Sequence, residues 1–450
     1  MSLTRTTKIA TISAMLALGL SACPGTDGAG GGDDDGIGPL PPGEGSSGGT
    51  GNNVTTGLPP ADTGAMTGGA DNGSSEDDDN GDNSVDTKFD IPPFPDLSGP
   101  ENTCDTDPNA DEDNDGFSVN EGDCNDCDAN VNPGAIEVEV TEPDEMGMIP
   151  EAADENCDGL IDNVLPPCDA GLALGDTDPM SGAAAIGLCK TSTGPGDWGI
   201  VSAEYVRADG SALNAPLQHG LMPDFGTNIT SLEGDSMLVL SSGRARTTGQ
   251  ADACNNYTCI ESGASTAPAG FPQDVVGCSG GTAIFDDMAL ELTLRAPTNA
   301  TGYAFSFDFY SFEYPEYVCT AWNDQFIALV DPPPPGSIDG NISFDAMTNP
   351  VSVNVAFFEV CQGCPLGTGE LLGTGFDIWD TADFLNPPIG SAGATSWLAT
   401  TAPVDPGSEV TIRFTIWDTG DQQWDSTVLI DNFRWIADGG TVAVGTQPEG

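Results

Sequence analysis

The stretch YAFSFDF, residues 303–309, decides the fold class of this chain. Its aromatic residues alternate with small or polar ones, and this period of two is typical of a β-strand with two different faces. The same alternation recurs at residues 351–355 and 410–416. Because Gly, Pro and Asn turns separate these runs, the sequence predicts a mainly β chain in which residues 167–438 form a jelly-roll-like β-sandwich.

Segments at both ends bound this sandwich. Trp198 and the following GIVSAEYVRADG open it, and TVLIDNFRW at 427–435 is interpreted as its closing strand. A helical turn is expected near residues 380–384, and residues 439–450 are expected to form a disordered tail. The opening and closing segments, together with FSFDFYSFEYP at 305–315, resemble choice-of-anchor L domains of bacterial surface proteins. That resemblance implies a β-fold beside a cell-surface anchor and no particular activity.

An acidic module over residues 100–166 precedes the sandwich. Residues 101–163 contain 21 Asp and Glu and no Lys or Arg, so the module repels itself unless a cation neutralises it. DEDNDG at 111–116 places carboxylates at every second position before a glycine turn, as calcium loops do. The twelfth position of an EF-hand is Gly122 here, and helical flanks are missing. The pattern therefore predicts a calcium loop that is not an EF-hand.

Further acidic groups follow this loop. DCND at 123–126, PGA at 133–135 and NCDGLID at 156–162 complete a pattern that resembles the MopE-type metal-binding motif of exported bacterial proteins, although Cys127 and the insert at 137–153 depart from it. Copper is disfavoured because soft sites use His, Met or thiolate, whereas a disulfide-pinned acidic linker remains the alternative to calcium. The expected metal ligands are Asp111, Asp113, Asp115, the carbonyl of Phe117, Asp123, Asn125, Asp126, Asp158 and Asp162.

The first 23 residues have the features of a targeting segment. After a positively charged start, residues 9–20 form an apolar run that is too short to span a bilayer. Leu20–Cys23 resembles a bacterial lipobox, which implies lipidation of Cys23 and anchoring in the cell envelope, with Pro24 favouring the outer membrane. The alternative is an ordinary secretory signal. Residues 24–99 are rich in Gly, Ser, Asp and Pro and are expected to form a disordered tether.

The cysteines support export. Apart from Cys23, 12 of the 13 cysteines remain, and an even number indicates disulfides in an exported protein. The four in the acidic module are expected to pair among themselves, and a redox role for the two Cys-x-x-Cys pairs is the alternative. The disulfide candidates are Cys104, Cys124, Cys127, Cys157, Cys168, Cys189, Cys254, Cys259, Cys278, Cys319, Cys361 and Cys364.

Charge and aromatic content limit the partners. A formal net charge of −61 with only 10 Lys and Arg excludes nucleic acid, which binds through clustered cations. Tryptophans of the sandwich either stack on sugar rings or belong to its core. A second candidate metal site comprises carboxylates in and after the turn at residues 418–421, with solvated turn residues as the alternative; its members are Asp418, Asp421, Asp425 and Asp431.

These features favour a non-catalytic, calcium-binding lipoprotein of the cell surface whose sandwich binds an extracellular polysaccharide or protein. One alternative is a secreted glycan-acting hydrolase with two carboxylates in a cleft, and another is a structural spacer of the envelope. GCSGG at 277–281 matches a nucleophile-elbow pattern. Because strand-like residues follow it and the single histidine, His219, precedes it, no catalytic residue is assigned.

Overall fold

The computed structural model describes residues 107–139, 152–355, 357–377, 392–437 and 440–449. The targeting segment with Cys23, the tether over residues 24–99, Cys104 and the turn expected near residues 380–384 lie outside the described residues. Within the described part of the chain, no helix has the length and apolar character needed to cross a bilayer.

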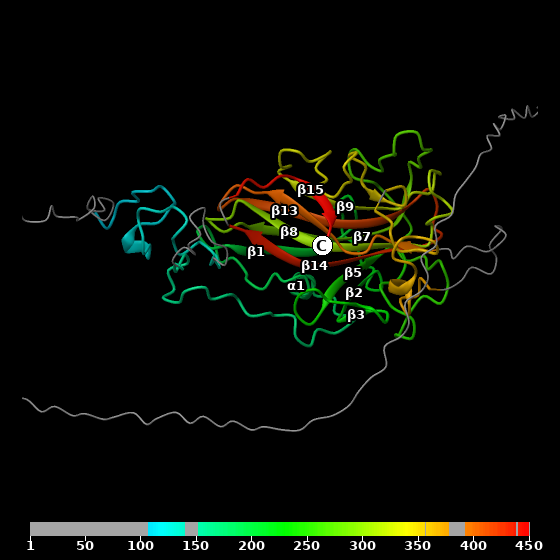
Figure 1. The fold of residues 1–450 in the computed structure, drawn as a ribbon, viewed down its shortest axis with the longest axis horizontal. Helices are drawn as coiled ribbons and strands as arrows, with labels where there is room; N and C mark the ends of the chain where they lie inside the picture. Colours follow the sequence, from blue (N-terminus) through cyan, green and yellow to red (C-terminus); the bar gives the residue numbers. More distant parts are fainter. Residues whose placement is uncertain (1–106, 140–151, 356, 378–391, 438–439, 450) are drawn as a thin grey trace, which may run out of the picture. The chain divides into compact units, whose positions relative to one another are not determined.

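Antiparallel strands form a sandwich of two large sheets (Figure 1). The strands are β1 (Gly199–Val206), β2 (His219–Met222), β3 (Asp224–Phe225), β4 (Ile229–Thr230), β5 (Met237–Ser241), β6 (Ala264–Ser265), β7 (Ile284–Arg295), β8 (Gly302–Ser311), β9 (Gln325–Asp331), β10 (Val351–Ser352), β11 (Gly393–Ala394), β12 (Leu398–Pro403), β13 (Glu409–Thr419), β14 (Ser426–Ile436) and β15 (Gly445–Pro448). The first sheet has the order β1-β7-β13-β9-β10, with β6 beside β7. The second has the order β15-β12-β8-β14-β5-β2, with β11 beside β8, and β3 pairs only with β4. This confirms the predicted β-sandwich.

Among the residues that the structure describes, three short helical segments accompany the strands, namely η1 (Val119–Glu121), α1 (Pro179–Ala184) and η2 (Gly369–Leu371). Helix α1 begins after Asp178, whose carboxylate accepts a hydrogen bond from the backbone N–H of Met180 at 3.0 Å, with Pro179 at the first helical position. Its Gly182 faces Tyr205 of β1, where a side chain would meet the tyrosine hydroxyl at 2.6 Å. The helix therefore packs closely on the first sheet.

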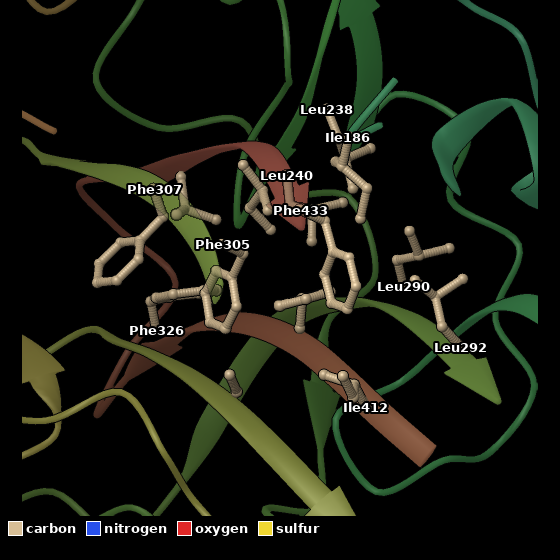
Figure 2. Packing of buried hydrophobic residues seen from close by; sticks show 14 of the residues in the cluster. Ile186, Leu238, Leu240, Leu290, Leu292, Phe305, Phe307, Phe326, Ile412 and Phe433 are labelled. Atoms are coloured by element: carbon tan, nitrogen blue, oxygen red, sulfur yellow. The ribbon is translucent and has the colours of Figure 1, made fainter. Parts of the chain in front are cut away.

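The main core lies between the two sheets and is made by alternate residues of the long strands. The ring of Phe305 meets Phe414 of β13, and the ring of Phe307 meets Phe326 of β9, each at 4.9 Å between centroids. Figure 2 shows Phe305, Phe307 and Phe326 in the same interior with aliphatic residues of β5, β7 and β13. Aromatic residues two apart on β8 thus build the core, as the alternation predicts.

The opposite face of β8 is also covered. Every residue of this strand is buried, including Ser306 and Asp308. A second apolar cluster, which contains Phe225, Tyr310 and Phe376, packs loops and the small β3–β4 sheet on this side. Strand β8 therefore carries polar residues into the interior of the protein.

Two predictions about the end of the sandwich are wrong. TVLIDNFRW forms β14, but this strand lies between β8 and β5 instead of closing the fold. The last strand is β15, inside the segment expected to be a disordered tail, and it pairs with β12 from Leu398↔Pro448 to Thr401↔Gly445. The pairing satisfies the exposed edge of β12, which is a physical reason for the tail to become a strand.

Candidate metal centre

Hydrogen bonds between its own carboxylates and backbone N–H groups fix the conformation of the first acidic loop, residues 111–116. The Asp111 carboxylate accepts the N–H groups of Asn114 at 2.7 Å and Gly116 at 3.1 Å. Asp113 accepts from Asp115 at 3.2 Å, and Asp115 accepts from Phe117 at 2.8 Å. Gly116 has a φ of +99°, which favours glycine, and permits the turn. Each of these carboxylates binds backbone N–H groups, so the loop is shaped before any ion arrives.

Helical segment η1 returns the chain to this loop. Ser118 and Glu121 cap it through a hydrogen bond from the Ser118 N–H to Oε2 of Glu121 at 3.1 Å, and Gly122 ends it with a φ of +109°. Asp123 and Asp126 follow and are 3% and 0% exposed. Asp126 accepts the N–H of Glu112 at 3.0 Å, which fixes the second group against the first loop.

Five carboxylates converge here in two overlapping sets that share Asp113. One set is Asp111, Asp113 and Asp115, and the other is Asp113, Asp123 and Asp126; within each, one oxygen per residue lies within 4.8 Å of the others. The Oδ2 atoms of Asp113, Asp115, Asp123 and Asp126 are buried and have no hydrogen-bond partner. Buried, unpartnered carboxylate oxygens are costly unless a cation binds them.

The pKa values of this cluster reflect its burial. Burial raises the pKa of Asp115 to about 6, with repulsion from Asp113 adding to the effect. It also raises the pKa of Asp113 and Asp123, to which neighbouring carboxylates contribute. The side-chain atoms that this cluster offers to a metal are all carboxylate oxygens. A hard cation such as calcium prefers ligands of this kind.

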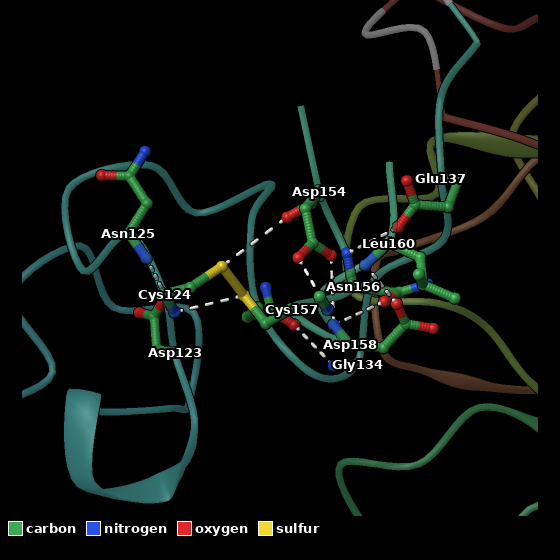
Figure 3. The surroundings of a disulfide bond; sticks show 12 residues. Asp123, Cys124, Asn125, Gly134, Glu137, Asp154, Asn156, Cys157, Asp158 and Leu160 are labelled. Carbon is green, nitrogen blue, oxygen red and sulfur yellow. Dashed lines mark hydrogen bonds between the residues drawn. A yellow bond between two sulfur atoms is a disulfide. The ribbon is translucent and has the colours of Figure 1, made fainter. Parts of the chain in front are cut away.

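Two predicted ligands contribute less clearly. The N–H of Asn125 binds Asp123 at 2.8 Å, and Figure 3 shows its side chain pointing away from the Cys124–Cys157 disulfide. The ring of Phe117 lies beside Gly196 of the sandwich, 3.2 Å from the position of an added Cβ. Neither contact involves the side-chain oxygen of Asn125 or the carbonyl of Phe117, so both residues stay predictions as metal ligands.

The third acidic group forms a separate loop that repeats the geometry of the first. Asp154 accepts the N–H groups of Asp158 at 3.1 Å and Gly159 at 2.8 Å, while Asn156 accepts from Asp158 at 2.9 Å. Gly159 has a φ of +90°, close to that of its counterpart Gly116. Asp158 therefore belongs to this loop, and among the described carboxylates it does not join the first cluster. Asp154 and Asn156 are not among the expected metal ligands, although their spacing before Gly159 repeats that of DEDNDG.

Asp162 and Glu137 support this second loop. Glu137 accepts the N–H groups of Asn156 at 3.1 Å and Asp162 at 2.9 Å. Burial raises the pKa of Glu137, and Oδ1 of Asp162 is buried without a hydrogen-bond partner. The Cys124–Cys157 disulfide links the two loops (Figure 3). The nine predicted ligands are thus divided between two linked loops.

Hydrogen bonds join the acidic module to the sandwich. Asn299, in the connection between β7 and β8, accepts the N–H of Ile136 at 3.0 Å and donates to its carbonyl at 2.8 Å. The Thr298 hydroxyl donates to the side chain of Asn132 at 2.6 Å, and its N–H donates to the carbonyl of Gly134 at 3.0 Å. The Pro-Gly-Ala stretch of the motif thus forms the junction.

The described cysteines are joined in disulfides. The pairs are Cys124–Cys157, Cys168–Cys189, Cys254–Cys259, Cys278–Cys319 and Cys361–Cys364, and Cys127 is also disulfide-bonded. Cys254 and Cys259 lie near Asp425, but their sulfurs are bonded to each other and offer no thiolate to a metal. The predicted disulfide-rich character is therefore confirmed.

The second candidate site is only partly brought together. Asp418 and Asp425 are buried at one end of the sandwich, and Asp421 lies nearby in the turn between β13 and β14. Asp431 lies elsewhere, where it accepts N–H groups from Leu232 and Asn432, each at 2.6 Å. Six residues of extended strand separate it from Asp425, which corresponds to about 20 Å. Its inclusion in this site was wrong.

The aromatic and histidine candidates are largely structural. Trp417 is fully buried, and Trp424 is half-buried in a stack with Tyr257 at 5.7 Å. His219 is buried in β2 with its ring stacked on Tyr205 at 4.0 Å, and burial lowers its pKa to about 4. These residues pack against their neighbours inside the fold.

Comparisons with known proteins agree with the sandwich. No curated protein matches the sequence. The family described as Choice-of-anchor L domain matches residues 211–433, a range that begins after β1 and includes most of β14. The chain therefore carries a region similar to the Choice-of-anchor L domain, a β-domain consistent with presentation at the cell surface.

Proposed function

We propose that this chain is a non-catalytic, calcium-binding lipoprotein of the bacterial cell surface, which presents its β-sandwich to an extracellular polysaccharide or protein. The match to a surface-type domain supports the location and the presenting role. The Leu20–Cys23 lipobox supports a lipid anchor on Cys23.

One observation carries the calcium proposal. Asp113, Asp115, Asp123 and Asp126 each bury an Oδ2 atom that has no hydrogen-bond partner. No Lys or Arg lies between residues 101 and 163 to neutralise them. Protein donors therefore leave these oxygens unsatisfied, and a calcium ion with six to eight oxygen ligands would satisfy several at once.

Calcium would order the acidic module against the sandwich. Extracellular calcium modules bind at about 10⁻⁴–10⁻³ M, so occupancy would follow the calcium of the medium. An ion present at 100-fold excess over its Kd stabilises the folded state by about 2.7 kcal/mol. The sandwich has its own core and disulfides and would keep its fold when calcium is removed from the module.

The test is a calcium titration of the full chain, followed by limited proteolysis with and without chelator. We expect saturable binding and protection of residues 107–163 from cleavage. Asp126→Asn removes a buried ligand and should weaken binding by about tenfold or more, which is about 1.4 kcal/mol. Asp128→Asn is the matched control, because Asp128 is an exposed carboxylate two residues away.

The proposal fails if the full chain binds no calcium at millimolar concentration. It also fails if Asp126→Asn and Asp128→Asn weaken binding equally, because that result would indicate a diffuse acidic surface. The module would then be a disulfide-pinned acidic linker.

A further inference from the structure

A cavity of about 460 Å³, here called the junction cavity, lies where the acidic module meets the sandwich. Ile136 and parts of the second acidic loop up to Leu165 line it from the module. Trp198, Glu233 and residues 433–435 line it from the sandwich. Pockets for small ligands measure about 300–1,000 Å³, so the junction cavity has the size of a ligand site.

Two tryptophans of this cavity are half-buried and fixed in place by their neighbours. The ring of Trp435 meets Phe433 edge-on at 5.3 Å between centroids and Tyr303 at 6.0 Å. Phe433 itself belongs to the main core (Figure 2). The Lys190 ammonium lies 4.9 Å from the ring centroid of Trp198 and donates to the carbonyl of this residue at 3.2 Å. A ligand would therefore meet flat apolar surfaces whose orientation is already fixed.

An acidic and a basic side chain lie beside these rings. Glu233 and Arg434 are both exposed, and they are close enough for the charge of Arg434 to act on the carboxylate of Glu233. Among the residues that the structure describes, neither side chain makes a hydrogen bond or an ion pair. The cavity thus offers one free donor group and one free acceptor group to a ligand. A hydroxyl suits both, because it donates and accepts hydrogen bonds.

This lining favours one chemical class of ligand. A purely apolar ligand would remove the charges of Glu233 and Arg434 from water without replacing their hydrogen bonds. An acidic ligand would be repelled by a chain with a net charge of −61. A neutral saccharide avoids both costs, because its C–H face can pack on an aromatic ring while its hydroxyls make hydrogen bonds at the ring edge.

Trp198 also lines a second cavity of about 490 Å³, together with Phe117 and Arg295. The two cavities therefore meet at one tryptophan ring. A single sugar unit can occupy only one of them, whereas a chain of sugar units can extend from one to the other past Trp198. The arrangement favours an oligosaccharide over a monosaccharide.

We propose that the junction cavity binds a neutral oligosaccharide. Trp198 and Trp435 pack against sugar rings, and Glu233 and Arg434 hydrogen-bond to sugar hydroxyls. The proposal rests on the presenting role proposed above and names the site and the ligand class for it. It differs from the earlier sugar candidates such as Trp417 and Trp424, which pack inside the fold.

The test is calorimetric titration of the full chain, in millimolar calcium, with cellotetraose, mannotetraose and galactotetraose, and with trigalacturonic acid as the acidic counterpart. We expect saturable binding of at least one neutral probe and no binding of the acidic one. Trp198→Ala removes a ring that both cavities share and should weaken binding by about tenfold or more. Trp322→Ala is the matched control, because Trp322 is 39% exposed and lines neither cavity. It should bind as wild type does.

A second variant guards against damage to the fold by the loss of a large ring. Arg434→Gln changes an exposed side chain, so its Tm should stay close to that of wild type. The loss of a charged hydrogen-bond donor should weaken saccharide binding by about tenfold. The proposal is overturned if no neutral probe binds, if trigalacturonic acid binds as well as they do, or if Arg434→Gln and Trp322→Ala both bind as wild type does.

This proposal and the calcium proposal fail separately. If calcium binds and no saccharide does, the oligosaccharide is excluded and a protein is left as the partner of the calcium-binding chain. If a saccharide binds and calcium does not, the junction cavity is retained and the calcium proposal is excluded.

Discussion

Asp308 carries its carboxylate into the middle of β8, where it is fully buried. Its Oδ1 atom accepts a hydrogen bond from the hydroxyl of Thr395 at 3.1 Å. Burial raises the pKa of Asp308 to about 7, and Glu370 nearby adds repulsion. The phenol of Tyr310 lies on the same side. A single buried carboxylate therefore links the stability of the sandwich to pH.

The sign of this effect follows from the two pKa values. The ordinary pKa of Asp is 3.8 and the folded value is about 7, so folding takes up a proton between these pH values. The contribution of protonated Asp308 to folding stability is complete below pH 3.8, and it is lost as the pH rises through 7. The maximum difference is about 4 kcal/mol.

We expect Asp308→Asn to remove this pH dependence. We measure the free energy of unfolding by urea unfolding in chelator. The difference between the variant and wild type should shift in favour of the variant between pH 4 and pH 8, by up to about 4 kcal/mol. Asp331→Asn on β9 makes the same change of charge at an exposed position and serves as the control. Parallel pH profiles for wild type and Asp308→Asn would contradict the prediction.

At the scale of elements, the acidic loops and the strands obey different rules. DEDNDG folds through hydrogen bonds between residues two to five apart, so its geometry follows from local sequence. The position of the module depends instead on contacts such as Ile136 with Asn299, which are 163 residues apart. Local spacing therefore shapes the loop, and tertiary contacts place it.

Asn299→Ala should release the acidic module without disturbing its loops. The change removes the donor and the acceptor that bind Ile136 and leaves both of its backbone groups unpaired, at a cost of about 1 kcal/mol for each hydrogen bond. In calcium, residues 107–163 should be cleaved faster than in wild type, while the Tm of the sandwich changes little. Asn228→Ala removes one exposed side-chain hydrogen bond, to the carbonyl of Gly369, and is the control. Equal cleavage of the two variants would show that this junction does not hold the module.

At the scale of the whole molecule, the charge of −61 restricts how the protein reaches a membrane. Anionic headgroups repel a chain this acidic, so electrostatic adsorption does not support attachment. The proposed attachment therefore depends on acyl chains at Cys23, whose hydrophobic contribution is insensitive to salt.

Cys23→Ser tests this dependence. We expect wild type to incorporate radiolabelled fatty acid and to stay with the membrane fraction through washes at low and high salt. The Ser variant should incorporate no label. Ser21→Ala, which changes the same segment and keeps the cysteine, should behave as wild type. Labelling of Cys23→Ser would refute the lipid anchor at this position.

The sequence by itself determined the features that depend on near neighbours. A period of two in YAFSFDF indicates a strand because successive side chains of a strand point to opposite faces. Alternate carboxylates before Gly116 indicate an ion loop because the turn is made within six residues. Both inferences use only spacing, so they survive without knowledge of the rest of the fold.

Only the tertiary structure decided which distant residues meet. Sheet pairing brings the buried Asp324 to Thr419 and Ser426, which are 95 and 102 residues away in the sequence. The same pairing separates Asp431 from Asp425 and makes a strand of the terminal residues 445–448. The physical reason is that the strand order between sheets is set by burial of the whole apolar surface, which no local pattern contains.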